Sequence, residues 1–114
     1  MFREIIDHLD SSKFIESFEV MEYYDEENVK LIKIRANLKN SSISYIREFI
    51  KADGSNYSYH WQDSTGKLLL RWDNAPHHPH ITTFPHHFHS GNQIKATYRV
   101  TIKEVLEEIE KFLD

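Results

Sequence analysis

The alternation of apolar and polar side chains between positions 57 and 73 constrains the fold more than any other feature of the sequence. It is interrupted at residues 63–66, whose final glycine supplies the left-handed residue that a hairpin loop needs. We therefore expect a β-hairpin that pairs Gln62 with Lys67, because a one-residue slip would mix the two faces. One face then carries Tyr57, Tyr59, Trp61, Leu68, Leu70 and Trp72. The other carries Ser58, His60, Gln62, Lys67, Leu69, Arg71 and Asp73.

The residues before this hairpin indicate a short helix followed by further strands. Phe2, Ile5, Ile6 and Leu9 share one face of a helix, and the polar residues 10–12 end it. Between positions 12 and 74, β-branched and aromatic residues are separated by breaks at residues 25–28, 39–41, 53–55 and 63–66. This pattern predicts five strands joined by short turns, and a sixth short strand is expected at about residues 93–100.

The C-terminal segment has the clearest helix signal. Thr101 and Glu104 form a capping box, with Thr at the N-cap and Glu three positions later. The apolar stripe that follows consists of Val105, Leu106, Ile109, Phe112 and Leu113. We expect this helix to pack on the apolar face of the sheet. The predicted fold is therefore α+β, a largely antiparallel meander of five or six strands with a short N-terminal helix and a C-terminal helix packed on one face.

Length and composition exclude several classes of protein. The 114 residues suit one domain, 1–114, since roughly 100 to 150 residues is usual for a single core. Without cysteine there is no disulfide and no Cys nucleophile, so any metal must be held by histidine and carboxylate. The net charge of −4 argues against electrostatic binding of nucleic acid over the whole protein surface, but it permits a local basic patch. The charged N-terminus and the lack of a long apolar run predict a cytoplasmic protein without a membrane segment.

Residues 74–92 interrupt the strand pattern and concentrate the histidines. They hold all three prolines and six of the eight histidines, in two Pro-His-His-x-His units at 76–80 and 85–89. Since proline fixes φ and removes a hydrogen-bond donor, we expect a rigid, ordered loop and no strand here. In extended backbone, the histidines two residues apart in each unit point the same way.

Three interpretations of this loop remain open. The histidines hold a metal such as zinc or nickel, through His78, His80, His87 and His89. Alternatively two imidazoles act as base and acid in metal-independent RNA cleavage, in which the 2′-hydroxyl is the nucleophile and no cofactor is required. In the third interpretation the histidines form only a polar loop.

The acid–base interpretation assigns roles to residues of the hairpin and the loop. His78 and His87 exchange protons, Arg71 stabilises the phosphorane, and Asp73 with Asn74 orients an imidazole or the substrate. Substrate-binding roles are assigned to His60, Lys67, His77 and His86. No Ser or Cys nucleophile is required by this chemistry.

One run of residues carries a resemblance to a known family. It comprises residues 59–63, Gly66, residues 70–79, residues 83–87 and His89. Over this run the sequence resembles the TumE family of prokaryotic toxins, in which R-[YW]-D-N falls on residues 71–74. The family's histidines fall on His77, His78, His86, His87 and His89. Trp72 stands where tyrosine is familiar, and His80 is additional.

The resemblance implies the toxin of a toxin–antitoxin pair, whose antitoxin partner carries a helix-turn-helix DNA-binding domain. RNA as the substrate follows by analogy with other small toxins. Our main hypothesis is an endoribonuclease toxin that uses histidine acid–base catalysis. The alternatives are a metal-binding protein, either a metal-dependent nuclease or a sensor, and a non-enzymatic inhibitory interaction module. A homodimer is compatible with each.

Overall fold

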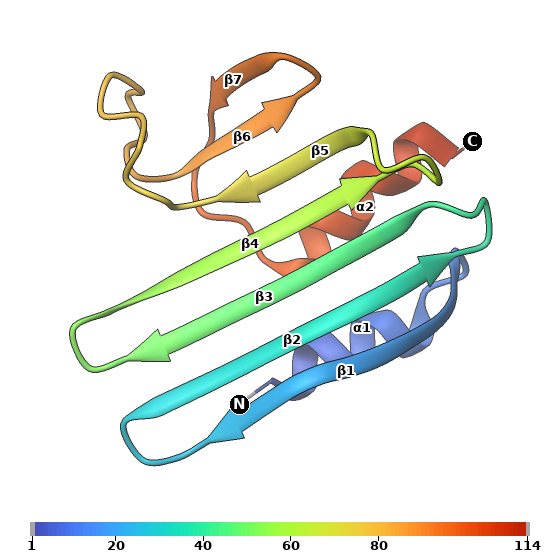
Figure 1. Ribbon diagram of the computed structural model, residues 1–114, viewed down its shortest axis with the longest axis horizontal. Helices are drawn as coiled ribbons and strands as arrows, with labels where there is room; N and C mark the ends of the chain where they lie inside the picture. The colour runs from blue at the N-terminus through green and yellow to red at the C-terminus, as the bar shows by residue number, and fades with distance from the viewer. Residues whose placement is uncertain (1, 114) are drawn as a thin grey trace.

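The computed structural model describes residues 2–113 and contains one seven-stranded antiparallel sheet with two helices (Figure 1). The strands are β1 (Ile15–Asp25), β2 (Val29–Leu38), β3 (Ile43–Lys51), β4 (Gly54–Gln62), β5 (Leu68–Asp73), β6 (His87–Ser90) and β7 (Gln93–Ala96). The helices are α1 (Arg3–Ser11) and α2 (Ile102–Leu113). Each strand pairs with the next along the chain, so the sheet is a simple meander. The α+β prediction is confirmed, as are five strands between positions 12 and 74, although the total exceeds the predicted five or six.

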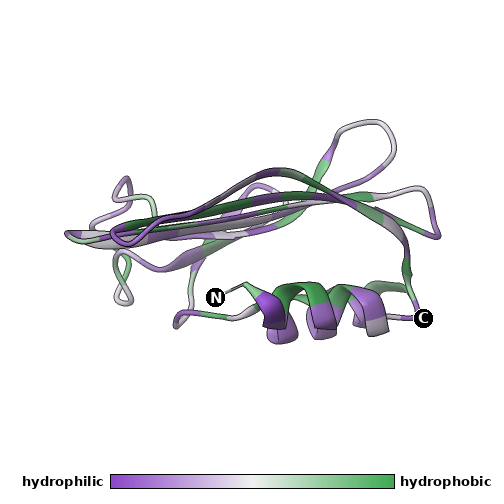
Figure 2. Ribbon diagram, turned by 90° about the horizontal axis from the view of Figure 1, so that it is seen from below, coloured by the Kyte–Doolittle hydropathy of each residue, from purple (hydrophilic) through white to green (hydrophobic). Residues whose placement is uncertain are grey.

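Both helices lie on the same side of the sheet (Figure 2). We call this side the helix face; it carries Ile34, Ile46, Tyr59 and Trp72, all buried. The opposite side, the open face, carries the alternate residues of each strand and has no helix over it. The predicted hairpin faces are therefore confirmed for the aromatic residues, and the polar residues that alternate with them lie on the open face.

The two helices form as their sequences predict. In α1, Ile5 and Leu9 are buried, and the helix ends at Ser11. The Thr101 backbone N–H donates to the Glu104 carboxylate at 3.0 Å, so the residues of the predicted capping box do meet at the start of α2. Ile109 lies in the core, whereas Phe112 is exposed at the end of the stripe.

The register of the β4–β5 hairpin differs from the prediction. Gln62 pairs with Leu68 instead of Lys67, and beyond a bulge Trp61 pairs with Leu70. The cause is Asp63, whose Oδ1 accepts the backbone N–H of Lys67 at 3.0 Å, so that Lys67 belongs to the turn. Beyond the bulge the strands are displaced by two residues from the predicted register, and an even displacement leaves the side chains of that part of the hairpin on their predicted faces.

The sequence predicted a loop without strands over residues 74–92. This prediction is wrong for residues 87–90, which form β6. β6 pairs with β5, and Phe88 stacks on Trp72 with ring centroids 5.7 Å apart. The alternation of Phe88 with histidines is thus a strand signal that the neighbouring prolines obscured. β7 ends at Ala96, earlier than the predicted residue 100. No helix within residues 2–113 is long and apolar enough to cross a membrane.

Candidate functional site

Strand pairing brings distant polar residues together on the open face of β4, β5 and β6. His60 lies opposite Arg71, and Arg71 lies opposite His89. One step further along the strands, Asp73 lies opposite His87. His87 and His89 are two residues apart on β6, so they point the same way, as predicted for histidines at this spacing.

Asp73 lies at the centre of this group and is only 5% exposed. Its carboxylate accepts the Arg71 Nε–H at 3.0 Å and the Ala75 backbone N–H at 2.9 Å. His87 Nε2 lies 3.1 Å from Oδ1, and His89 Nε2 lies 3.6 Å from Oδ2. Burial alone would raise the pKa of Asp73, but these hydrogen bonds and the nearby positive charges outweigh it and hold the pKa below its ordinary value. Asp73 is therefore ionised at neutral pH.

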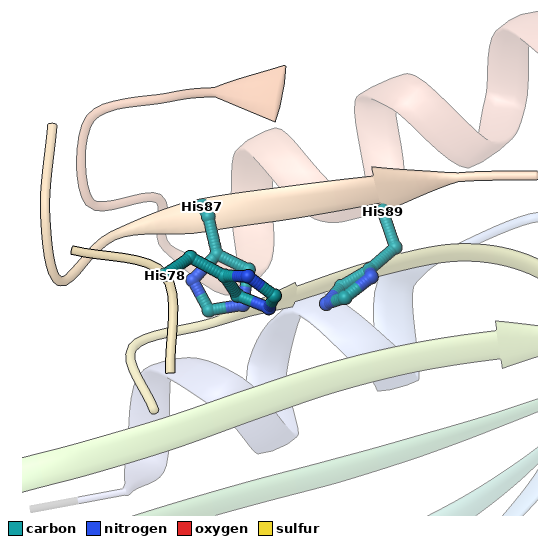
Figure 3. Close-up of side chains that lie close together, drawn as sticks. All are labelled: His78, His87 and His89. Carbon is teal, nitrogen blue, oxygen red and sulfur yellow. The ribbon is translucent and has the colours of Figure 1, made fainter. Parts of the chain in front are cut away.

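His78 comes from the loop and completes a cluster with His87 and His89 (Figure 3). One ring nitrogen from each of the three lies within 4.8 Å of the others. The His78 ring is 4.7 Å from that of His87 and 5.9 Å from that of His89, centroid to centroid. Three imidazoles at this separation can exchange protons with a common ligand or hold a common cation.

His87 is the buried member of the cluster, with 2% of its surface exposed. Its Nδ1 lies 3.0 Å from the Pro85 carbonyl oxygen, and its Nε2 faces the Asp73 carboxylate. Both ring nitrogens therefore face oxygen atoms, and these two contacts fix the orientation of the ring. His87 therefore orients its neighbours, and it has less access to a ligand than His78 or His89.

His89 and His60 both have pKa values below the ordinary value for histidine. Burial is the main cause that lowers the pKa of His89, and the positive charges of His87, Arg71 and His78 lower it further against the opposing effect of Asp73. Burial likewise lowers the pKa of His60, whose Nδ1 faces Arg71 Nη1 at 3.2 Å. Both rings are thus neutral at pH 7 and can accept a proton.

A pocket of about 320 Å³ opens beside the cluster on the same face. Arg47, Arg71 and Asp73 are among its lining residues. Asn74 borders the pocket too, but its side chain is engaged: it accepts the Tyr57 N–H at 3.0 Å and donates to the Ser55 carbonyl at 2.9 Å. Two guanidinium groups in one pocket suit a phosphate.

Some of the predicted site residues lie elsewhere. Lys67 is in the β4–β5 turn, at the end of β5 remote from Asp73. His77 and His80 are exposed on the loop. His86 Nδ1 lies 2.8 Å from the Tyr57 hydroxyl oxygen and the two rings stack, apart from the cluster.

His86 and Tyr57 form a small group of their own. Burial lowers the pKa of His86, and the nearby Arg99 lowers it further. Burial raises the pKa of Tyr57 to about 12, and the Arg99 guanidinium carbon lies 4.5 Å from the centre of its ring. This group connects the loop to the sheet.

Sequence reasoning missed Arg47. The alternation of side chains along β3 places Arg47 on the same face as Arg71. Only the pairing of Arg47 with Ser58, and of Ser58 with Asp73, brings the two arginines to one pocket. Strand alternation without the register could not have found it.

The ring nitrogens of His78, His87 and His89 are also atoms that could ligate one metal ion. Three imidazoles suit zinc, nickel or copper, and a carboxylate behind two of them resembles the support that metal-binding histidines receive. His80, one of the four predicted ligands, lies outside the group of three. Binding would require His87 to release one of its two oxygen partners.

The comparisons with known proteins give one match. The family model described as "Toxin TumE" matches residues 3–113. No curated protein and no solved structure matches the chain.

Proposed function

This chain belongs to the TumE family of toxins, and from this membership and the geometry of the open face we propose that it arrests growth by cleaving RNA. As a toxin of this family it has an antitoxin partner. The observation that supports cleavage is the grouping of Arg71, Asp73 and three imidazoles beside a pocket with two guanidinium groups. This grouping supplies proton transfer and phosphate binding together.

In the proposed reaction His89 is the base and His78 the acid. His89, neutral at pH 7, takes the proton of an RNA 2′-hydroxyl, whose oxygen attacks the adjacent phosphorus. The bond from phosphorus to the 5′-oxygen breaks, and His78 in its protonated form donates a proton to that oxygen. The products are a 2′,3′-cyclic phosphate end and a 5′-hydroxyl end.

The remaining residues bind and orient. Arg71 and Arg47 hold the non-bridging phosphate oxygens from the adjacent pocket, where negative charge grows as the phosphorane forms. Asp73 and His87 hold the rings in place. From the sequence, His87 was expected to fill the second proton-transfer role beside His78. Because His87 is buried, the proposal gives that role to His89 and makes His87 a positioning residue.

A second candidate function is a metal-dependent nuclease or a metal sensor. It is favoured by the mutual distances of up to 4.8 Å among ring nitrogens of His78, His87 and His89. Under this candidate the same rings are ligands and transfer no protons themselves. It predicts stoichiometric zinc or nickel in untagged protein and a melting temperature that EDTA lowers.

The deciding experiment incubates metal-stripped protein with a mixed RNA pool, with and without zinc or magnesium, and maps the new ends. We expect cleavage without metal that leaves 2′,3′-cyclic phosphate. Cleavage only with metal would support the second candidate. No cleavage under any condition would contradict both nuclease candidates and favour an inhibitory interaction module.

Variants connect the cleavage to the site. His89→Gln and Arg71→Ala should each reduce cleavage by about 10²-fold or more, whereas His77→Gln, an exposed histidine of the same loop, should cleave as the wild type does. An oligonucleotide with 2′-deoxyribose at the cleaved position should stay intact. Undiminished cleavage by a folded His89→Gln protein would remove the proposed base.

A further inference from the structure

The edge of the sheet farthest from the histidine cluster exposes an unusual number of large apolar side chains. Val20, Met21, Tyr23 and Tyr24 on β1 are between 43% and 57% exposed. Within residues 2–113, β1 pairs with β2 alone, so its other edge has no strand of this chain beside it (Figure 1). Val20 and Tyr23 pair with Ile34 and Ile32 and lie on the helix face, whereas Tyr24 pairs with Leu31 and lies on the open face. The exposed apolar side chains therefore flank this edge on both sides, and grouped apolar exposure marks interaction sites more often than single residues do.

A groove adjoins this edge on the helix face. It has a volume of about 550 Å³ and lies between α1 and β1. Phe2, Arg3 and Ile6 line one side, Val20 and Tyr23 the other, and Ile32 is also part of the lining. These side chains can receive apolar groups of a partner.

The same edge is acidic. Glu16, Glu19, Glu26 and Glu27 take part in no ion pair within residues 2–113. Two further carboxylates, Glu22 and Asp25, pair with lysines of β2. A second copy of this chain, laid along β1, would oppose acid to acid, which is unfavourable. The charge therefore favours a partner that brings lysine or arginine.

Irregularities in the pairing of β1 with β2 affect how a partner can bind to the free edge of β1. Register shifts between Ile15 and Ser17 and between Val20 and Glu22 interrupt the β1–β2 ladder. Bulges of this kind disfavour continuous strand addition along an edge. Recognition then rests on side chains more than on a new backbone ladder.

We propose that this surface, the groove together with the acidic edge of β1, is where the antitoxin docks. The occupant is a segment of the antitoxin whose apolar side chains enter the groove and whose lysine or arginine side chains meet the glutamates of β1. The histidine cluster lies on the open face, whereas the groove is lined by residues of α1 and by the helix-face residues Val20, Tyr23 and Ile32. This proposal rests on the family assignment and does not depend on nuclease activity.

The test measures binding of the purified cognate antitoxin to variants of the full chain. Val20→Asp with Tyr23→Asp, and separately Glu16→Lys with Glu19→Lys, should each weaken binding by about tenfold or more. The affinity of the wild-type protein should fall as salt is added. The variants should retain their toxicity in cells and escape neutralisation by the antitoxin.

Matched controls lie on other surfaces. Ile94→Asp, on the opposite edge strand β7, changes an apolar residue that is 37% exposed. Glu107→Lys with Glu110→Lys reverses two charges on α2. Both controls should bind the antitoxin as the wild type does.

Two results would overturn the proposal. The first is wild-type antitoxin affinity in both folded β1 variants. The second is a wild-type dimer, seen by light scattering, that the β1 substitutions dissociate, because the occupant would then be a second copy. Circular dichroism of each variant verifies that it is folded.

Discussion

Asp73 joins side chains that come from three places in the chain: Arg71 on its own strand, His87 and His89 on the next strand, and the backbone of the loop at Ala75. A buried carboxylate with this many donors is stable only when all of them stay in place. The chemistry of each neighbouring ring then depends on Asp73, because its carboxylate lies 3.1 Å from His87 Nε2 and its charge opposes the lowering of the pKa of His89.

Replacing Asp73 should therefore affect activity more than folding. We expect Asp73→Asn to reduce RNA cleavage by about 10²-fold, because both β6 imidazoles lose the charge that orients them. The free energy of unfolding should fall by about 1 to 3 kcal/mol, since His87 keeps a neutral acceptor. Urea unfolding and cleavage rates measure the two effects. Asp7→Asn, an exposed carboxylate on α1, is the control and should change neither.

The lowered pKa of His89 predicts a pH profile. The base must be neutral, so cleavage should fall as the solution becomes more acidic, with a midpoint below 6.5, the ordinary pKa of histidine. Rates measured from pH 5 to pH 8 on one oligonucleotide give this midpoint. A midpoint well above 6.5 would be incompatible with His89 as the base.

β6 is the element that carries two of the three clustered imidazoles. It is four residues long and is held by pairing with β5 and by the stacking of Phe88 on Trp72. Phe88 lies on the helix face while His87 and His89 lie on the open face. An apolar contact on one side of the strand thus supports the placement of the two imidazoles on the other.

Phe88→Ala should release β6 while leaving most of the sheet intact. We expect faster amide hydrogen exchange in β6 and β7, unchanged exchange in β2 and β3, and a loss of about 2 kcal/mol in the free energy of unfolding, because Phe88 is only half-buried. RNA cleavage should fall with the loss of order. Phe88→Leu should restore part of both, and equal exchange in wild type and Phe88→Ala would show that the stacking does not hold the strand.

Basic and acidic side chains gather in different parts of the molecule. Arginine and histidine gather on the open face, whereas unpaired carboxylates gather along β1 and the turn after it, so a chain of net charge −4 still offers a positive site. This distribution supports the two proposals, an RNA substrate on the open face and a basic antitoxin segment at the far edge.

Three histidines with lowered pKa values make the stability of the whole molecule depend on pH. For His60, His86 and His89, the unfolded chain takes up protons near pH 6.5, whereas the folded protein does so only at lower pH. The unfolded state then binds more protons, so stability should fall as the pH decreases through 6.5. Urea midpoints at pH 7.5 and 5.5 measure this fall. His60→Asn should reduce it and the exposed His77→Asn should not.

Local patterns in the sequence were sufficient for the elements and their faces. Alternation predicted which side of the β4–β5 hairpin is buried, because successive strand residues point to opposite faces whatever the register. The capping pair Thr101 and Glu104 predicted the start of α2. Each of these signals acts between residues a few positions apart, where the chain itself determines the geometry.

The grouping of the site was decided by the tertiary structure. His78 meets His87 and His89 only because the loop returns to lay β6 beside β5, and Arg47 lines the same pocket as Arg71 only through the register of three strands. Such contacts depend on which strands pair, how far each turn displaces the register, and which apolar face is buried. Those choices are made by the packing of the whole chain, and short-range sequence patterns do not encode them.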